Sequence, residues 1–156
     1  MLYSDTEITQ LTKKGADQMN NYKKDIIASL EGFKKVGESG GTFITNLFWN
    51  PATNETKSIC VRDYDYNDCS RDIDELYYMP IDEEAKINYQ HSLGVILEGD
   101  TVMIVKGRKI PAGSVKKVRK KYPFKDRYGR WQADYLYFED GTKTNVNNCI
   151  LVLETA

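Results

Sequence analysis

The sequence predicts an α+β protein with a long N-terminal helix, a β-hairpin with a short helix, and a five-stranded antiparallel β-barrel at its C-terminal end. Three observations predict this order. Residues 5–35 repeat apolar side chains at a helical spacing, and residues 42–64 hold two β-rich runs around a turn. Residues 99–153 alternate short β-rich runs with Gly, Pro and Asp-Gly about every ten residues. We therefore expect segments at 1–36, 42–94 and 95–156.

The N-terminal helix begins at a capping box, because Ser4 is followed three residues later by Glu7. Its apolar side chains recur at steps of about eleven residues, close to three helical turns, and so stay on one side of the helix. They are Ile8, Leu11, Met19, Tyr22, Ile26, Leu30 and Phe33. The helix is expected to reach about Lys35. It either packs across the rest of the protein or joins copies of the chain into a homo-oligomer through residues 5–35.

A hairpin is predicted after the helix. Residues 37–41, with three glycines, predict a flexible joint. Thr42–Trp49 and Lys57–Tyr64 are rich in β-branched and aromatic residues and flank an Asn50-Pro51 turn. We expect this hairpin either to extend the sheet of the barrel or to pair with a second copy of the chain.

An acidic segment and a short helix follow. Residues 62–75 are rich in Asp, Asn and Ser, whose side chains compete for backbone groups, so no helix is expected there. A helix is expected from Asp82 to about Ser92, since acidic residues lie at its start and Gly94 follows its end.

Five strands are expected in the C-terminal barrel: Thr101–Lys106, Ser114–Tyr122, Trp131–Phe138, Thr142–Asn145 and Cys149–Leu153. The second has few aliphatic side chains among its lysines, which predicts a strand at an exposed edge. Asp140-Gly141 predicts a type I′ hairpin turn, and residues 146–148 a tight turn.

The C-terminal segment resembles a known module. Its opening, Gly99-Asp100-Thr101-Val102-Met103-Ile104-Val105-Lys106-Gly107, resembles the KOW-type SH3-like barrel of ribosomal proteins and transcription elongation factors. The longer string Val105–Gly113, with Asn145-Val146-Asn147-Asn148, looks like small bacterial and phage proteins that carry such a module. The resemblance implies an SH3-like barrel over about residues 99–153.

Charge is distributed unevenly along the chain. Residues 99–156 hold 8 Lys and 4 Arg against 6 acidic residues, a net +6, whereas residues 1–98 carry −7. The three cysteines form no Cys-x-x-Cys pair, which is typical of reduced thiols in the cytoplasm. No apolar run approaches the about 20 residues of a membrane span. We therefore expect a cytoplasmic protein with no membrane partner.

Catalytic and cofactor motifs are not found. The sequence has one histidine and neither a P-loop nor a Gly-x-Gly-x-x-Gly string, so we expect a non-enzymatic protein without a cofactor. The three cysteines with His91 lack the paired spacing of zinc sites. Asp63, Asp65, Asn67 and Asp74 partly follow the calcium-loop pattern, but the glycine of that pattern is replaced by Asp68. A solvated loop is the alternative.

A run of cations and aromatic residues is the strongest functional signal, because cations neutralise phosphates and aromatic faces stack on bases. We expect RNA or single-stranded DNA, or another anion, to bind Arg108, Lys109, Lys116, Lys117, Arg119, Lys120, Lys121, Lys125, Arg127, Tyr128, Arg130 and Trp131. The alternative is a solvated edge strand that the acidic residues 63–84 cover.

The acidic segment is a candidate protein-binding surface, since it presents carboxylates and tyrosines as a nucleic-acid backbone presents phosphates. Its residues are Asp63, Tyr64, Asp65, Tyr66, Asp68, Asp72, Asp74 and Glu75. Two alternative functions follow. One is a phage- or mobile-element-encoded inhibitor that binds a host defence protein or, as an oligomer, sequesters a small anionic ligand. The other is a homo-oligomeric structural or docking protein.

Overall fold

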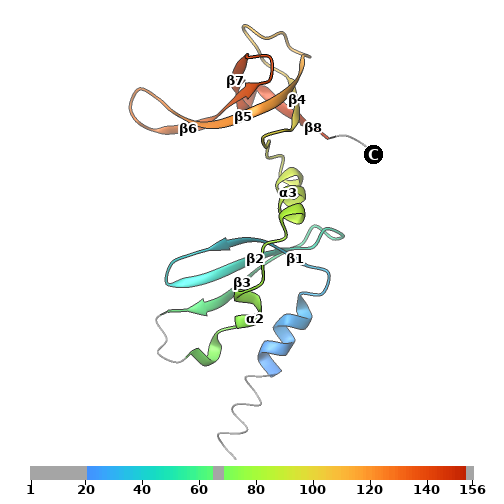
Figure 1. The fold of residues 1–156 in the computed structure, drawn as a ribbon, viewed down its shortest axis with the longest axis vertical. Coiled ribbons are helices and arrows are strands. Elements are labelled where there is room, and N and C mark those ends of the chain that lie inside the picture. Colours follow the sequence, from blue (N-terminus) through green and yellow to red (C-terminus); the bar gives the residue numbers. More distant parts are fainter. Residues whose placement is uncertain (1–20, 65–68, 154–156) are drawn as a thin grey trace, which may run out of the picture. The chain divides into compact units, whose positions relative to one another are not determined.

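The computed structural model (Figure 1) describes residues 21–64 and 69–153 of the protein. It contains two antiparallel sheets and a few short helices, which confirms the mixed α+β class. The chain divides into two compact units, and the boundary between Tyr89 and Gln90 lies inside a helix. Unit 1 precedes this boundary and unit 2 follows it.

Unit 1 is built on a three-stranded sheet of order β1-β2-β3. Residues 21–29 are helical. The elements that follow are β1 (Lys34–Ser39), β2 (Phe43–Trp49), β3 (Thr56–Asp63), η1 (Cys69–Arg71), α2 (Asp74–Tyr77) and α3 (Glu83–Ser92). The hairpin and the helix predicted at residues 82–92 are thus confirmed. The hairpin pairs with β1, and among the described residues its sheet is separate from that of unit 2. The first of the two alternatives, that the hairpin extends the sheet of the barrel, is therefore wrong, and pairing with a second copy stays a prediction.

The predicted extent of the N-terminal helix is wrong at its C-terminal end. The helix ends at residue 29, and Gly32 adopts a φ of 81°, which a helix cannot contain. Residues 34–39 form β1 instead, and the glycine-rich residues 40–42 form the β1–β2 turn rather than a joint between domains. The capping box at Ser4 and Glu7 lies outside the described residues.

Side chains pack on both faces of the unit 1 sheet. On one face, Phe48 and Val61 lie in a cluster with Leu30, Ile73 and Leu76, so the helix at residues 21–29 and α2 cover this face. On the other face, Val36 and Trp49 pack against Ala85 of α3.

Unit 2 is a five-stranded sheet of order β7-β6-β5-β4-β8. Its elements are β4 (Thr101–Ile104), β5 (Val115–Lys125), β6 (Trp131–Phe138), β7 (Lys143–Asn145), η2 (Val146–Asn148) and β8 (Cys149–Val152). Each predicted strand is present, within a few residues of its expected bounds. The predicted edge position of the second strand is wrong, because β5 lies in the middle of the sheet.

The length of β5 explains this error. Its first residues pair with β4, and from Val118 onward it pairs with β6, so this strand of 11 residues is hydrogen-bonded to two neighbouring strands. Val118 is buried in a cluster with Val102, Ile104, Leu136 and Phe138. A single inward valine is enough here, because the neighbouring strands supply the other apolar side chains of the core.

Both hairpins of β6 turn in the same way. In each, the first residue of the turn accepts a hydrogen bond from a glycine three residues later: Asp126 from Gly129 at 3.0 Å and Phe138 from Gly141 at 3.1 Å. Of the described turn residues, only the glycines have positive φ, at 76° and 85°. This is a type I turn followed by a glycine bulge. The type I′ turn predicted at Asp140-Gly141 is therefore wrong, since that turn would need positive φ at both residues.

Candidate functional site

The predicted basic run contains two kinds of cation. Three of its lysines are already bound to carboxylates of unit 2. Lys116 pairs with Asp140, Lys117 lies 3.9 Å from Glu139, and Lys121 lies 3.3 Å from Asp134. Lys121 also donates a hydrogen bond of 2.9 Å to the carbonyl of Ile96. These three lysines hold neighbouring strands together and have reduced capacity for an external phosphate.

The pair of Lys116 and Asp140 is also part of a turn. The Asp140 carboxylate accepts hydrogen bonds from the backbone N–H and the hydroxyl of Thr142, at 3.0 and 2.5 Å. The hydrogen bond from Lys116 has the largest effect on the pKa of Asp140, and the two hydrogen bonds from Thr142 add to it. Together they hold this pKa well below its usual range. The sequence signal for this turn was strong, but the role of Lys116 in it depends on strand pairing that no local pattern reveals.

The second kind of cation lies at the end of the β5–β6 hairpin. Lys125, Arg127 and Arg130 form no ion pair with any carboxylate of the described residues. Two of them contact aromatic rings instead: Lys125 Nζ is 4.5 Å from the ring centre of Trp131, and Arg127 Cζ is 5.0 Å from that of Tyr128. Their charge is therefore available to a ligand.

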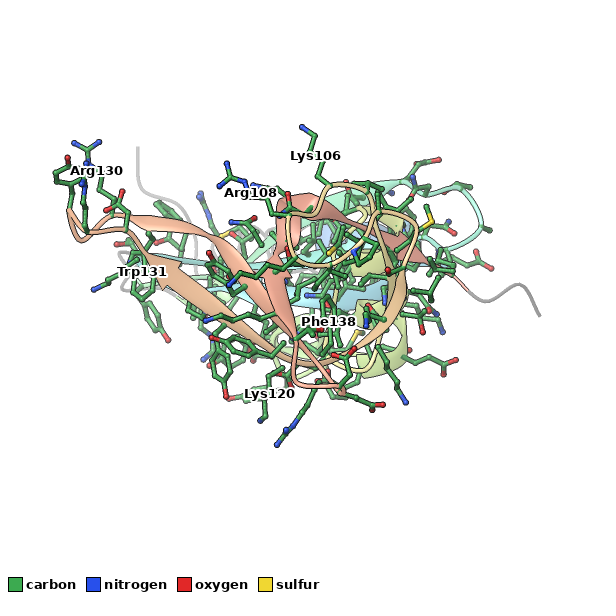
Figure 2. All side chains as sticks on the ribbon, turned by 90° about the horizontal axis from the view of Figure 1, so that it is seen from above. Lys106, Arg108, Lys120, Arg130, Trp131 and Phe138 are labelled. Carbon is green, nitrogen blue, oxygen red and sulfur yellow. The ribbon has the colours of Figure 1, made fainter. Side chains whose placement is uncertain are left out.

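The aromatic side chains of this hairpin are open to solvent. Tyr128 is 70% exposed and Trp131 is 64% exposed. The carboxylate of Asp126 accepts hydrogen bonds from the backbone N–H groups of Tyr128 and Arg130, at 2.9 and 3.0 Å, so the one acidic residue between these cations fixes the turn. Figure 2 shows Arg130 and Trp131 at the projecting end of the hairpin, with Phe138 at its other end. Of the predicted binding residues, the structure thus brings Lys125, Arg127, Tyr128, Arg130 and Trp131 together on one hairpin.

A row of tyrosines continues from the hairpin onto the sheet. Tyr122 lies directly opposite Tyr135, and Lys120 lies opposite Tyr137, so these four side chains share one face. The rings of Tyr122 and Tyr137 meet edge to face at 5.4 Å. Lys120 and Arg119 are exposed and have no ion pair among the described residues. We call Tyr122, Lys125, Arg127, Tyr128, Arg130 and Trp131 the hairpin surface.

The remaining predicted cations of unit 2, Arg108 and Lys109, lie on the loop between β4 and β5 and not on the hairpin surface. They line a groove of about 740 Å³ together with residues of β6, β7 and η2. Figure 2 shows Arg108 on this loop, apart from Arg130. Sequence reasoning did not bring Arg108 and Lys109 together with other residues that line this groove, among them Lys106, Tyr135, Lys143, Thr144, Asn145 and Asn148. The signal for them was the hairpin after Phe138, whose register places Lys143 opposite Tyr137 and Asn145 opposite Tyr135.

The acidic segment binds cations of its own unit. Arg62 lies 3.5 Å from Asp72 and 2.9 Å from Asp74, and Asp72 is buried. Tyr64 and Glu75 are exposed, whereas Asp63 donates its backbone N–H to Asp72 at 3.4 Å. Predicted positions Asp65, Tyr66 and Asp68 lie outside the described residues. Two of the carboxylates proposed for a protein partner thus stabilise unit 1.

Arg62 is the centre of this arrangement. Its guanidinium carbon lies 3.8 Å from the ring centre of Tyr77 and 5.6 Å from that of Tyr78. Side-chain hydrogen bonds to Tyr78 and then Asp74 raise the pKa of Arg62 above its ordinary value, so it remains charged at all relevant pH. A second pocket of about 480 Å³ lies beside Arg62 and is lined by both cations and carboxylates.

Cys149 and His91 both have structural surroundings in unit 2. Cys149 is buried in the core of unit 2, and this burial raises the pKa of its thiol to about 11. Cys60 is exposed. His91 Nε2 lies 2.8 Å from Asp100, which also accepts the backbone N–H of Leu97. Within residues 21–64 and 69–153, no three His, Cys, Asp or Glu side chains are grouped as metal ligands.

The described part of the chain includes no helix that is both long and apolar enough to cross a membrane. Comparison of the chain with models of protein families, with curated proteins and with solved structures found no match.

Proposed function

We propose that the protein binds single-stranded nucleic acid, in the first place RNA, without catalysing a reaction, and that the hairpin surface is the binding site. One observation carries the proposal. At the end of the β5–β6 hairpin, three cations without a carboxylate partner among the described residues lie beside two aromatic rings that are about two thirds exposed.

This combination suits a single strand better than a duplex. A single strand offers phosphates to Lys125, Arg127 and Arg130 and unpaired bases to Tyr128 and Trp131, and each stacked base contributes about 1–3 kcal/mol. Tyr122 gives the strand a further ring on the same hairpin. A duplex, by contrast, keeps its bases stacked inside and leaves only the phosphates to bind.

The topology of unit 2 supports the same class of function. The first strand, β4, lies between the second and the last, and the short helix η2 precedes the last strand. This order agrees with the SH3-like barrel that the KOW-type opening at Gly99 implies. KOW-type modules belong to proteins that act on RNA and on the transcription machinery, which is why RNA is our first candidate.

Trp131 gives a direct test. The other tryptophan, Trp49, is buried in unit 1, so quenching of the exposed Trp131 reports a base stacked on it. We expect a single-stranded RNA of about ten nucleotides to quench the fluorescence with a Kd in the micromolar range or lower. Three phosphate contacts predict a slope of about −2 for log K against log salt concentration.

Matched controls separate this site from general attraction to positive charge. Arg130→Glu should weaken binding at least tenfold, whereas Lys24→Glu, the same charge reversal on the exposed surface of the helix at residues 21–29, should leave it unchanged. Duplex RNA should bind more weakly than the single strand. Three results would each overturn the proposal: no quenching of Trp131, an affinity that does not depend on salt concentration, or equal losses of RNA affinity in Arg130→Glu and Lys24→Glu.

A further inference from the structure

We propose that the groove beside the β4–β5 loop, which we call the loop pocket, is a second binding site and takes the phosphate monoester of a nucleotide. It is lined mainly by the β4–β5 loop, β7 and η2, which contribute nothing to the hairpin surface, and it shares only strand β6 with that surface. The proposal does not depend on the function proposed for the hairpin surface. The pocket lining is positively charged. Four cations line the pocket, and no carboxylate of the described residues does. These cations are Lys106, Arg108, Lys109 and Lys143.

An anion held there would not have to displace ion pairs. None of the four cations is ion-paired within the described residues. Arg108 and the three lysines also come from two segments far apart in sequence, the β4–β5 loop and β7. Mutual repulsion of four like charges around one cavity is unfavourable, and a phosphate that enters relieves it.

The loop that carries three of these cations is fixed in position. Ile104 and Gly113 close it with a hydrogen bond of 2.7 Å, and Val105 donates its N–H to the carbonyl of Asn148 at 2.8 Å. Gly107 is required by the bend, because a Cβ there would lie 1.8 Å from the carbonyl oxygen of Ile110. The shape of the pocket is therefore largely set before a ligand arrives, which lowers the entropic cost of binding.

Other parts of the pocket lining, from β6 and from the loop itself, suit the base of a nucleotide. Tyr135 contributes a half-buried aromatic ring, and Val105 and Ile110 line the pocket with aliphatic side chains. Amide groups complete this lining: Asn145 Oδ1 accepts a hydrogen bond from the backbone N–H of Asn147 at 2.9 Å, and Asn148 Nδ2 donates one to the Thr144 hydroxyl at 3.0 Å. A volume of about 740 Å³ is within the range of pockets that hold small ligands, about 300–1,000 Å³.

Isothermal titration calorimetry of the full chain with AMP, adenosine and inorganic phosphate tests the assignment. We expect AMP to bind more tightly than either fragment, because the phosphate and the base would be held by different side chains of the pocket. Lys143→Glu and Lys106→Glu should each weaken AMP about tenfold or more. Lys24→Glu makes the same charge change outside the pocket and should leave AMP binding unchanged.

The phosphate can come from a free nucleotide or from the 5′ end of a strand, and a second arm distinguishes them. In the Trp131→Ala protein, a short oligonucleotide with a 5′ phosphate is compared with its 5′-hydroxyl form. Binding of AMP would show that a free nucleotide is enough to occupy the pocket. A preference for the 5′-phosphorylated strand without AMP binding identifies a strand end. Either result supports the site if Lys143→Glu removes it.

Three results would overturn the proposal. They are the absence of binding in both arms, equal affinity for adenosine and AMP, and losses in Lys24→Glu as large as those in Lys143→Glu. Circular dichroism melting of each variant confirms that it is folded. Lys106 and Lys143 lie on separate elements and are both exposed, so a folding defect in one variant leaves the other as a valid test.

Discussion

The two units use their charged residues differently. In unit 1, two cations are bound within the unit: Lys35 is buried between a carboxylate and a carbonyl, and Arg62 binds Asp72 and Asp74. In unit 2, cations at the hairpin surface and in the loop pocket are not bound to any described carboxylate. Charge in unit 1 therefore stabilises the fold, whereas part of the charge in unit 2 is available for a ligand.

The same contrast exists within the basic run of unit 2. Lys116, Lys117 and Lys121 are bound to carboxylates of β6 and its hairpin, whereas Lys125, Arg127 and Arg130 are not. A count of positive charges does not separate the two groups. What separates them is the pairing of β5 with β6, which brings acidic side chains within reach of the first group only.

The largest effect is expected at Lys35 in unit 1. Its side chain is fully buried, and its Nζ donates to Glu38 at 2.5 Å and to the carbonyl of Met79 at 2.6 Å. Lys35→Ala removes both hydrogen bonds and leaves a cavity, so we expect the free energy of unfolding of unit 1 to fall by about 3 kcal/mol. Denaturant unfolding followed through Trp49 measures it.

Lys35→Met is the matched variant, because it keeps the aliphatic volume and removes the charge. It should destabilise unit 1 less than Lys35→Ala does. RNA binding should be the same in both variants as in the parent. A loss of RNA affinity in Lys35→Met would mean that the charge of unit 1 is not purely structural, and the comparison of the two units would fail.

The next largest effect concerns the two groups of cations. Replacing Lys125, Arg127 and Arg130 together by Ala should weaken single-stranded RNA about 100-fold, since three charge-assisted contacts are lost. Replacing Lys116, Lys117 and Lys121 by Ala should have little effect on affinity and should lower the melting temperature of unit 2. Fluorescence titration and thermal melting of both triple variants measure the two quantities. Equal losses of RNA affinity in the two triple variants would show that Lys116, Lys117 and Lys121 also bind RNA despite their ion pairs.

The sequence predicted elements where local pattern and tertiary structure agree. Strand β6 has the predicted bounds, Trp131–Phe138, and at its C-terminal end the buried Leu136 and Phe138 alternate with the half-buried Tyr135 and Tyr137. β1 was missed because Lys34, Lys35 and Gly37 do not form a strand pattern. Lys35 is buried only because Met79, 44 residues away, supplies a carbonyl. Such a contact between distant residues is not encoded in any local window.

The candidate sites divide in the same way. The hairpin surface is one continuous segment, so its cations and aromatic residues are visible in the sequence. The loop pocket is not one continuous segment and is therefore not visible in the sequence. The pairing of β6 with β7 brings Tyr135 beside Asn145, and the loop that closes the pocket lies more than 20 residues earlier. Arg108 and Lys109 were predicted as cations, but their partners required the sheet register.

A smaller effect is expected from the acidic partner of Lys116. Because the pKa of Asp140 is lowered in the folded protein, its carboxylate stabilises unit 2 above its unfolded pKa of about 4, and this contribution is lost as the pH falls below that value. Asp140→Asn should therefore lower the melting temperature of unit 2 at pH 7, and the difference from the parent should shrink towards pH 3. A difference that is independent of pH would show that the turn, rather than the charge, accounts for the stabilisation.

The smallest effect concerns thiol reactivity and leaves both stability and affinity unchanged. In a Cys69→Ser protein at pH 8, Cys60 should react quickly with a thiol reagent because it is exposed. Cys149 should react only when unit 2 opens, because burial raises its pKa to about 11 and hides it from the reagent. Its labelling rate then reports the opening of unit 2 alone. Asp140→Asn should raise that rate, whereas Lys35→Ala, which acts in unit 1, should not. If both substitutions raised it equally, the two units would not open independently, and charge in one would affect the stability of the other.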